Sequence, residues 1–406
     1  MARYNVGGVW LPRPFQIRKF SHAGLYYADF KAMLRFYVGI LGFQAADYTD
    51  QYIRPQMADL YTVGPVIFLR MNTDHHGFNL FPDSYRTDRD KHTIIQQISW
   101  DVGTYDELRR CVDYLKEKKV ELEYVGRRMP GSNYSVYFRD PDDHRQHLNW
   151  NMEQVGWQGI SKPLAIWEDI RRVQGFPEAT VSDDEEVTRL LSPKTDEAIE
   201  QAGHSTDRYQ SLEREIVAPL FPREPYRVEG LLLPRPFRIT RPAYIGLYVR
   251  DVGASTSFFT EILGFRLSDL VQINGEKVAF LRHGADHHSL CLYPLKLRES
   301  LGDGARATLA RIAFEVQTYK ELKDSIAYFQ ERGVQVLWQG RSFPGGEYAV
   351  DLRDPEGNRV RLFFYMEQNG WQGVSRPADA WGQPKEGLPG TIDPDSDTYQ
   401  THVFGF

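Results

Sequence analysis

The sequence predicts an α+β fold made by tandem duplication, in which four modules of the order β-α-β-β-β are paired into two domains. The first observation is that several motifs occur twice, in the same order, along the 406 residues. They are LPRPF at 11–15 and 233–237, ILGF at 40–43 and 262–265, DHH at 74–76 and 286–288, and GWQG at 156–159 and 370–373. Self-similarity of this kind indicates a repeated architecture. We therefore place the copies at 6–167 and 228–381, separated by an acidic linker at 168–227 and followed by an extended tail at 382–406.

The second observation is the order of elements in the first half of a copy. A β-rich alternating segment at 22–27 predicts a strand, and Asp29 then begins a helix. The apolar face of this helix carries Phe30, Leu34, Tyr37 and Leu41 at helical spacing, and Gly42 ends it. Further strands are predicted at 59–62, 66–71 and 77–81.

The second half of the copy repeats this order. A strand is predicted at 94–102, and Thr104 with Glu107 forms the pattern of a capping box. The helix that follows is predicted to bury Leu108, Cys111, Val112 and Leu115. Strands are predicted at 120–125, 135–139 and 145–151, the last two joined by a turn at 140–143. Helices on one face of a curved mixed sheet give an α+β fold. In the linker, short helices are predicted at 187–191 and 212–217.

Composition excludes several classes of partner. The chain is 41% hydrophobic and 26% charged, as is usual for a soluble globular protein. Its net charge of −6 argues against nucleic acid as a partner. No apolar run is long enough to span a membrane. The two cysteines, Cys111 and Cys291, lie in apolar segments, which is typical of buried thiols in a reducing, cytoplasmic protein.

The module order and three motifs resemble the vicinal oxygen chelate superfamily, which includes glyoxalases, bleomycin resistance proteins and extradiol dioxygenases. The closest resemblance is to the type I extradiol ring-cleaving dioxygenases. The motifs are FYVGILGF at 36–43, the DHH segment followed by an alternating strand, and FRDPDDHR at 138–145 with its counterpart LRDPEGNR at 352–359. The resemblance covers both copies but neither the linker nor the tail. Because this superfamily hosts many reactions, the motifs indicate the fold more specifically than the activity.

The resemblance implies a metal in the cup formed by one pair of modules. The ligands, usually His, His and Glu, come from the first strand of one module and from the first and last strands of the next. The matching positions are His22, Gln97 and His147 in the N-terminal copy, and Tyr244, Arg311 and Arg361 in the C-terminal copy. Since arginine stays protonated, the second set cannot hold a cation. The resemblance therefore places the metal in the N-terminal copy, whereas the usual extradiol enzymes hold it in the C-terminal one.

The N-terminal set also departs from the family. An amide replaces one histidine and His147 replaces the carboxylate of the 2-His-1-carboxylate set that suits Fe(II). We expect Fe(2+) or another divalent metal such as Mn(2+), and whether Gln97 or Asn79 contributes a ligand is left open. Taken alone, each histidine would more often be a hydrogen-bonded strand residue than a ligand, and Gln97 a polar residue lining the cup.

Two further residues match catalytic positions of the family. His76 matches its acid–base histidine, and Tyr137 matches its substrate-binding tyrosine. A histidine titrates near neutral pH and suits proton transfer. Strand alternation predicts that His75 points away from the cup.

These observations together predict a metal-dependent extradiol-type ring-cleaving dioxygenase. Its substrates would be O2 and a catechol-like or polyhydroxylated aromatic, with no nucleic acid or membrane as partner and a homo-oligomer left possible. Two alternatives remain open. One is a lyase or isomerase of the same superfamily, with a metal that polarises a carbonyl. The other is a metal-free protein that binds a flat small molecule.

Overall fold

A computed structural model describes residues 3–50, 65–128, 130–131, 133–156, 159–171, 175–178, 182–222, 224–304, 307–369, 373–381 and 385–392. The chain forms two compact units, each built on one large mixed sheet. The N-terminal unit comprises Met1–Phe30, Phe43–Lys91 and Ile95–Pro219, and the C-terminal unit comprises Lys31–Gly42, His92–Ile94 and Leu220–Phe406. The predicted α+β fold with two duplicated domains is confirmed.

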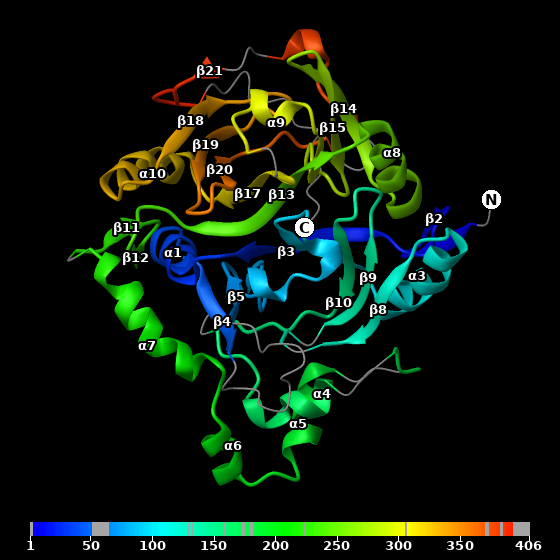
Figure 1. Cartoon of the computed structure of the whole chain (residues 1–406), viewed down its shortest axis with the longest axis vertical. Coiled ribbons are helices and arrows are strands. Elements are labelled where there is room, and N and C mark those ends of the chain that lie inside the picture. Colours follow the sequence, from blue (N-terminus) through cyan, green and yellow to red (C-terminus); the bar gives the residue numbers. More distant parts are fainter. Residues whose placement is uncertain are drawn as a thin grey trace. The chain divides into compact units, whose positions relative to one another are not determined.

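The sheet of the N-terminal unit has eight strands in the order β4-β5-β6-β3-β7-β10-β9-β8 (Figure 1). The bounds are β3 Ile17–Tyr27, β4 Gln44–Thr49, β5 Val66–Arg70, β6 Phe78–Pro82, β7 Ile95–Val102, β8 Leu122–Arg127, β9 Tyr134–Arg139 and β10 Arg145–Trp150. The two modules meet where β3 pairs antiparallel with β7. On their outer sides, β3 pairs parallel with β6 and β7 pairs parallel with β10. The first strands of the two modules therefore lie side by side at the centre of the sheet.

The sheet of the C-terminal unit repeats this order and adds one short strand, giving β14-β15-β16-β13-β17-β20-β19-β18-β21. The bounds are β13 Ile239–Val249, β14 Arg266–Ile273, β15 Glu276–Arg282, β16 Leu290–Pro294, β17 Leu309–Val316, β18 Val336–Arg341, β19 Tyr348–Arg353, β20 Arg359–Phe364 and β21 Lys385–Glu386. A small hairpin precedes each sheet, β1 Tyr4–Val6 with β2 Val9–Leu11, and β11 Tyr226–Val228 with β12 Leu231–Leu233.

One long helix packs on each sheet, α3 Tyr105–Glu117 and α10 Tyr319–Glu331 (Figure 1). Leu108, Cys111 and Leu115 are fully buried as predicted, whereas Val112 is only partly buried. The predicted capping box is half formed. The Thr104 side chain accepts a hydrogen bond from the backbone N–H of Glu107, but the Glu107 carboxylate accepts from the backbone N–H of Gln16, 2.9 Å away.

The first helix begins as α1 Phe30–Leu34 and continues in wider π-helical turns over Arg35–Ile40. Its counterpart is α8 Val252–Ser257, which continues as Phe258–Leu263. Lys31–Gly42 belongs to the C-terminal unit although it lies within the first sequence copy. There the Tyr37 hydroxyl donates to Asp354 Oδ2 at 3.0 Å.

The segment between the copies is helical and belongs to the N-terminal unit as far as Pro219. Its helices are α4 Trp167–Arg171, α5 Asp183–Leu191, α6 Asp196–Ala202 and α7 Thr206–Ile216. A complete capping box of Ser182 and Glu185 begins α5. Val187, Leu190 and Leu191 pack on the cluster formed by Ile166, Trp167 and Ile170. The predicted helices at 187–191 and 212–217 thus lie within α5 and at the end of α7.

Short helical turns complete the described chain, at Asp83–Tyr85, Asp88–Asp90, Leu164–Ile166, Ala218–Leu220, α9 Leu297–Ser300 and Ala378–Ala380. β4 was not predicted, and the strand predicted at 59–62 lies outside the described residues. No helix in the described part of the chain is both long enough and apolar enough to cross a membrane.

The Tyr37–Asp354 hydrogen bond gives a pH-dependent test of the C-terminal unit. Burial raises the pKa of Asp354 to about 6, against 3.8 for the ordinary group. Between these values the folded carboxyl keeps a proton that the unfolded one has lost, so its contribution to stability falls as pH rises. We expect Tyr37→Phe to cost about 1–3 kcal/mol at pH 8, where the buried carboxylate loses a donor, and clearly less at pH 5. Urea denaturation at both pH values measures the difference.

Tyr328→Phe is the matched control, because the Tyr328 hydroxyl donates at 3.3 Å to a neutral acceptor, the carbonyl oxygen of Ile40. Its cost should be the same at both pH values. Equal losses for Tyr37→Phe at pH 5 and pH 8 would contradict the assignment.

Candidate active site

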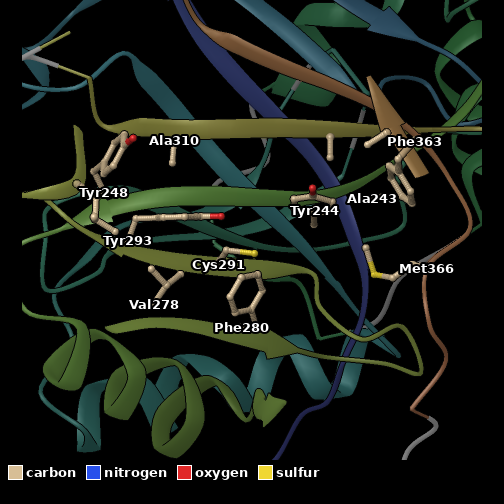
Figure 2. Packing of buried hydrophobic residues seen from close by; sticks show 13 residues of the cluster. Ala243, Tyr244, Tyr248, Val278, Phe280, Cys291, Tyr293, Ala310, Phe363 and Met366 are labelled. Carbon is tan, nitrogen blue, oxygen red and sulfur yellow. The ribbon is translucent and has the colours of Figure 1, made fainter. Parts of the chain in front are cut away.

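The cup faces of the two sheets differ in polarity at matched register positions. In the N-terminal unit, Ser99 lies opposite His22, Asn79 opposite Gly24, and Ser135 opposite Asn149. In the C-terminal unit, the same three register pairs are Ala313 with Tyr244, Cys291 with Gly246, and Ala349 with Phe363. Most of the latter residues belong to one apolar cluster (Figure 2). At these three register pairs, therefore, the N-terminal cup is polar and the C-terminal cup is largely apolar.

Several polar groups in the N-terminal cup are buried without a partner. Both side-chain amide atoms of Asn79 and Nε2 of His147 have no hydrogen-bond partner among the described residues. Both side chains are fully buried. An unsatisfied buried polar group costs about 1–3 kcal/mol, and such groups are rare in folded proteins. Their grouping on one face of the sheet, with Cys291 and Arg361 at the matching positions of the other copy, indicates a ligand site.

A row of aligned residues crosses the centre of this cup. Register places His22 of β3 opposite Ser99 of β7, Ser99 beside His147 of β10, and His147 opposite Tyr137 of β9. Ser99 Oγ lies 2.8 Å from His22 Nε2 and 2.9 Å from His147 Nδ1. The rings of Tyr137 and His147 stack with centroids 4.1 Å apart, which fixes the plane of the imidazole.

The histidines of the row are neutral. Burial, together with the nearby His75 and Lys19, lowers the pKa of His22 to about 3. Burial also holds the pKa of His147 well below its usual value. The Ser99 hydroxyl has a single proton and can donate it to only one of the two histidines. The hydrogen bonds of the row can therefore be arranged in two ways. In one of them His147 Nδ1–H donates to Ser99, Ser99 donates to His22 Nε2, and His147 Nε2 keeps a free lone pair. A ring held through its other nitrogen in this way is typical of histidine ligands.

The structure brings the predicted ligand positions together. Gln97 Nε2 lies 2.6 Å from His22 Nε2 and 3.5 Å from Ser99 Oγ. Asn79 lies on the same face of the sheet, through its pairing with Gly24, but does not line the cavity. Ser99 was missed in the sequence, where only its position two residues after Gln97 on the same strand face pointed to it.

His76, the predicted acid–base residue, is held by a chain of hydrogen bonds behind it. His75 Nε2–H donates to Asp47 Oδ2 at 2.6 Å, which leaves His75 Nδ1 as an acceptor. His76 Nδ1–H then donates to His75 Nδ1 at 2.7 Å, so His76 Nε2 carries a lone pair. The rings of His76 and His22 lie 4.3 Å apart. Burial and the neighbouring histidines hold the pKa of His76 well below its usual value.

Two serines complete this chain at Asp47. Ser161 Oγ donates to Asp47 Oδ2 at 2.7 Å, and Ser205 Oγ, from the segment between the copies, donates to Asp47 Oδ1.

The C-terminal unit keeps an Asp269–His287–His288 chain, but the Asp269 side chain is 18% exposed whereas that of Asp47 is 0% exposed. His75 was predicted to point away from the cup, and in the structure it does not line the cavity.

A small cavity of about 40 Å³ opens onto the row. All five predicted site residues line it. The complete lining is His22, Phe68, His76, Phe81, Tyr85, Gln96, Gln97, Arg128, Pro130, Asn133, Tyr137 and His147. Arg128 lies 3.8 Å over the Tyr124 ring at the edge of this space. The cavity holds water-sized molecules. An aromatic ligand would therefore enter only if side chains at the edge, such as Arg128, move aside.

The donor set fits a divalent metal in part. His22 and His147 are neutral imidazoles with ring centroids 5.4 Å apart, and His147 Nε2 is free to bind a cation. His22 Nε2 contacts Ser99 Oγ and Gln97 Nε2, so it would bind the same cation only in place of these contacts. The Ser99 hydroxyl, or the Gln97 amide once turned, would add an oxygen. Within the described ranges no group of three or more His, Cys, Asp or Glu side chains is arranged to hold a metal. A metal would therefore be held by neutral ligands alone, less tightly than by a set with a carboxylate.

The matched row of the C-terminal unit is an ion-pair network. Arg361 stands at the register position of His147 and binds both carboxylate oxygens of Asp351, at 2.6 and 2.9 Å. It also donates to Glu347, which in turn accepts from the Tyr244 hydroxyl at 2.9 Å. A permanently charged guanidinium thus takes the place where a ligand would stand.

Solved structures with a similar fold include two 2,3-dioxygenases and a glyoxalase. The 2,3-dioxygenase LapB from Pseudomonas sp. KL28 is 15% identical, with a TM-score of 0.55 over 90% of this chain and 95% of its own. Homoprotocatechuate 2,3-dioxygenase from Arthrobacter globiformis is 15% identical, with a TM-score of 0.56 over 89% and 84%. The Mn(II)-bound glyoxalase from Novosphingobium aromaticivorans is 15% identical, with a TM-score of 0.56 over 95% and 98%. At this identity the likeness extends to the fold alone.

No curated protein matches the chain at a significant level. The family model for the glyoxalase/bleomycin resistance protein/dioxygenase superfamily matches residues 19–148 and 241–362. These two regions cover more than half of the chain and correspond to the two sheets. The chain therefore belongs to the glyoxalase/bleomycin resistance protein/dioxygenase superfamily.

Proposed function

We propose that the N-terminal cup is the active site of a metal-dependent, extradiol-type ring-cleaving dioxygenase acting on a catechol-like aromatic. The observation that carries the proposal is the buried row of His22, Ser99 and His147, with an unpartnered His147 Nε2. In the other copy, an alanine stands at the position of Ser99 and an arginine at that of His147, so the row exists only in the N-terminal cup. The four-module fold shared with LapB supports the reaction class.

His22 and His147 would hold Fe(2+) or Mn(2+), with an oxygen ligand from Gln97 or Ser99. When bound, the cation supplies a Lewis acid that favours the ionised form of a catechol and brings it together with O2. The protein's own contribution is orientation and proton transfer. Stacking on Tyr137 fixes the His147 ring, and the rings of His76 and Phe68 lie 5.3 Å apart beside the cavity.

Proton transfer is assigned to His76. Its Nε2 lone pair is placed to accept the proton of a substrate hydroxyl, because the Asp47–His75 chain holds Nδ1–H in place. The Tyr137 hydroxyl would hydrogen-bond the remaining substrate oxygen. Burial of the row excludes bulk water, which strengthens these interactions during reaction.

Oxygen uptake tests the proposal. Purified protein is loaded anaerobically with Fe(II) or Mn(II) and mixed with a panel of substituted catechols in an oxygen electrode. We expect uptake of one O2 per substrate, together with the visible absorbance of a ring-opened product, only in metal-loaded protein. Metal-loaded protein that consumes no O2 with any catechol would contradict the dioxygenase.

A lyase or isomerase of the same superfamily is the second candidate, favoured by the neutral donor set, which has no carboxylate. In that reaction the cation would polarise a carbonyl, and His76 would move a proton between carbons. The same samples distinguish the two, because this activity would proceed at equal rate without O2. Binding of a catechol with no metal and no turnover would instead indicate a binding protein.

A further inference from the structure

We propose that the cup of the C-terminal unit is a second small-molecule site, which binds a small aromatic carboxylate through Arg311. This site is independent of the dioxygenase proposed above. It rests on one cation without a partner, on the access of solvent to it, and on the aromatic walls around it.

Arg311 lies at the centre of the sheet, on β17, where it pairs with Gly246 of β13. The absence of a side chain at Gly246 leaves room for Arg311 and Tyr293 above the sheet. A Cβ placed there would lie 3.1 Å from Tyr293 Cε2 and 3.4 Å from Arg311 Cγ. Arg311 occupies the register position that Gln97 occupies in the N-terminal cup, since each pairs with a glycine of the neighbouring central strand.

The other arginines near the cup are paired. Arg361 binds Asp351 and Glu347, while Arg353 and Arg359 share Asp303 at 3.3 and 3.4 Å. Arg311 has no hydrogen bond and no ion pair within the part of the chain that the structure describes, and its Nε is buried. The Asp351 carboxylate attracts this guanidinium from a distance without a hydrogen bond, so its N–H donors stay available to an anionic ligand.

Solvent reaches Arg311 from inside the cup. Its neighbours along the strand, Ala310 and Ile312, are 2% and 0% exposed, whereas Arg311 itself is partly exposed. The residues opposite it, Gly246 and Cys291, belong to the central strands of the sheet. An arginine that stays partly exposed at the centre of a sheet, on the face that Tyr244 and Ala313 share, is accessible to a soluble anion.

The surroundings suit a flat ring. Figure 2 shows Tyr293 reaching across the face of the sheet toward Tyr244, with Phe280 on the neighbouring strand and the small Ala310 nearby. Burial raises the pKa of Tyr293 to about 12, so its hydroxyl stays a neutral donor. A guanidinium fork matches a carboxylate in geometry, and a hydroxyl adds a further donor. Aromatic and alanine side chains provide the apolar walls that small-molecule sites use.

The alternative is that Arg311 only balances Asp351 and Glu347 at long range. In that case the cup would bind no anion, because the network would already be complete. A binding measurement separates the two, since the ligand site requires both a carboxylate and a ring.

Isothermal titration calorimetry of the full chain with benzoate tests the site, with benzyl alcohol and acetate as comparison ligands. We expect saturable binding of benzoate with a Kd of about 1 mM or tighter, and at least tenfold weaker binding of both comparison ligands. Arg311→Met should weaken benzoate at least tenfold. Gln97→Met, the matched change in the N-terminal cup, should leave benzoate affinity within about twofold.

The fold of Arg311→Met is checked by its Tm, which we expect to be kept because methionine fills much of the space of the arginine stem and no hydrogen bond of Arg311 is lost. If that variant fails to fold, Arg311→Lys keeps the charge but loses the fork, and should bind benzoate several-fold more weakly. The proposal is overturned if the wild type shows no saturable binding of benzoate. It is also overturned if Arg311→Met, or Arg311→Lys in its place, keeps wild-type affinity, or if Gln97→Met abolishes binding.

Discussion

His76→Phe is expected to lower turnover by about 10²–10⁴-fold while the metal content and the fold are kept. The reason is that His76 holds a proton-accepting Nε2 through the chain of His75 and Asp47 and contributes no ligand to the His22–Ser99–His147 row. Phenylalanine keeps a ring between Phe68 and His22, but this ring can neither accept nor donate a proton. Turnover, bound metal and Tm, measured on the same preparation, separate catalysis from ligation and packing.

His288→Phe is the matched control, because His288 lies in the same hydrogen-bonded chain of the C-terminal unit, where Arg361 stands at the ligand position. It should leave turnover nearly unchanged. If His76→Phe loses its metal, the histidine is a ligand. If it keeps near wild-type turnover with metal bound, the proton-transfer role fails.

His22→Ala is expected to abolish stoichiometric metal binding, with His147→Ala giving the same result. With no carboxylate among the described candidates, each imidazole is one of only two strong donors, so the loss of either leaves a site too weak to compete with water. The wild type should carry about one divalent metal per chain after anaerobic loading, as measured by elemental analysis. Turnover should disappear together with the metal.

The corresponding control is Tyr244→Phe, at the position of His22 in the other copy. Its metal content should equal that of the wild type. Equal metal in the wild type and in His22→Ala would show that the site lies elsewhere, and no metal in either would favour the metal-free binding protein.

Much of the fold could be predicted from the sequence because local patterns repeat. The helix at Tyr105–Glu117 and the strands on either side were found from periodicity and from duplicated motifs. β4 was missed because its sequence, QAADYT, is short and lacks a clear alternation. The carboxylate of Glu107 could not be assigned from spacing, since its partner Gln16 is distant in the sequence.

The candidate site was predicted in part. The family resemblance and strand parity predicted that His22, Gln97 and His147 lie in one cup, and in the structure all three line the same cavity. Ser99 was missed because a serine in a strand has no distinctive pattern, and its importance arises only from its register with both histidines. Asp47 lies on β4 and His75 follows β5, so the hydrogen bond between them forms only in the folded sheet and leaves no pattern in the sequence.

The hydrogen bond from Ser205 to Asp47 makes the segment between the copies part of the chain that holds His76. A chain that ended at residue 167 would keep every side chain of the His22–Ser99–His147 row, yet its Asp47 would lose a donor and the cover of α7. During synthesis, therefore, the hydrogen-bonded chain behind His76 is complete only after Ser205, well beyond the last strand of the N-terminal sheet, has left the ribosome. The segment between the copies thus supports the first domain and is more than a tether.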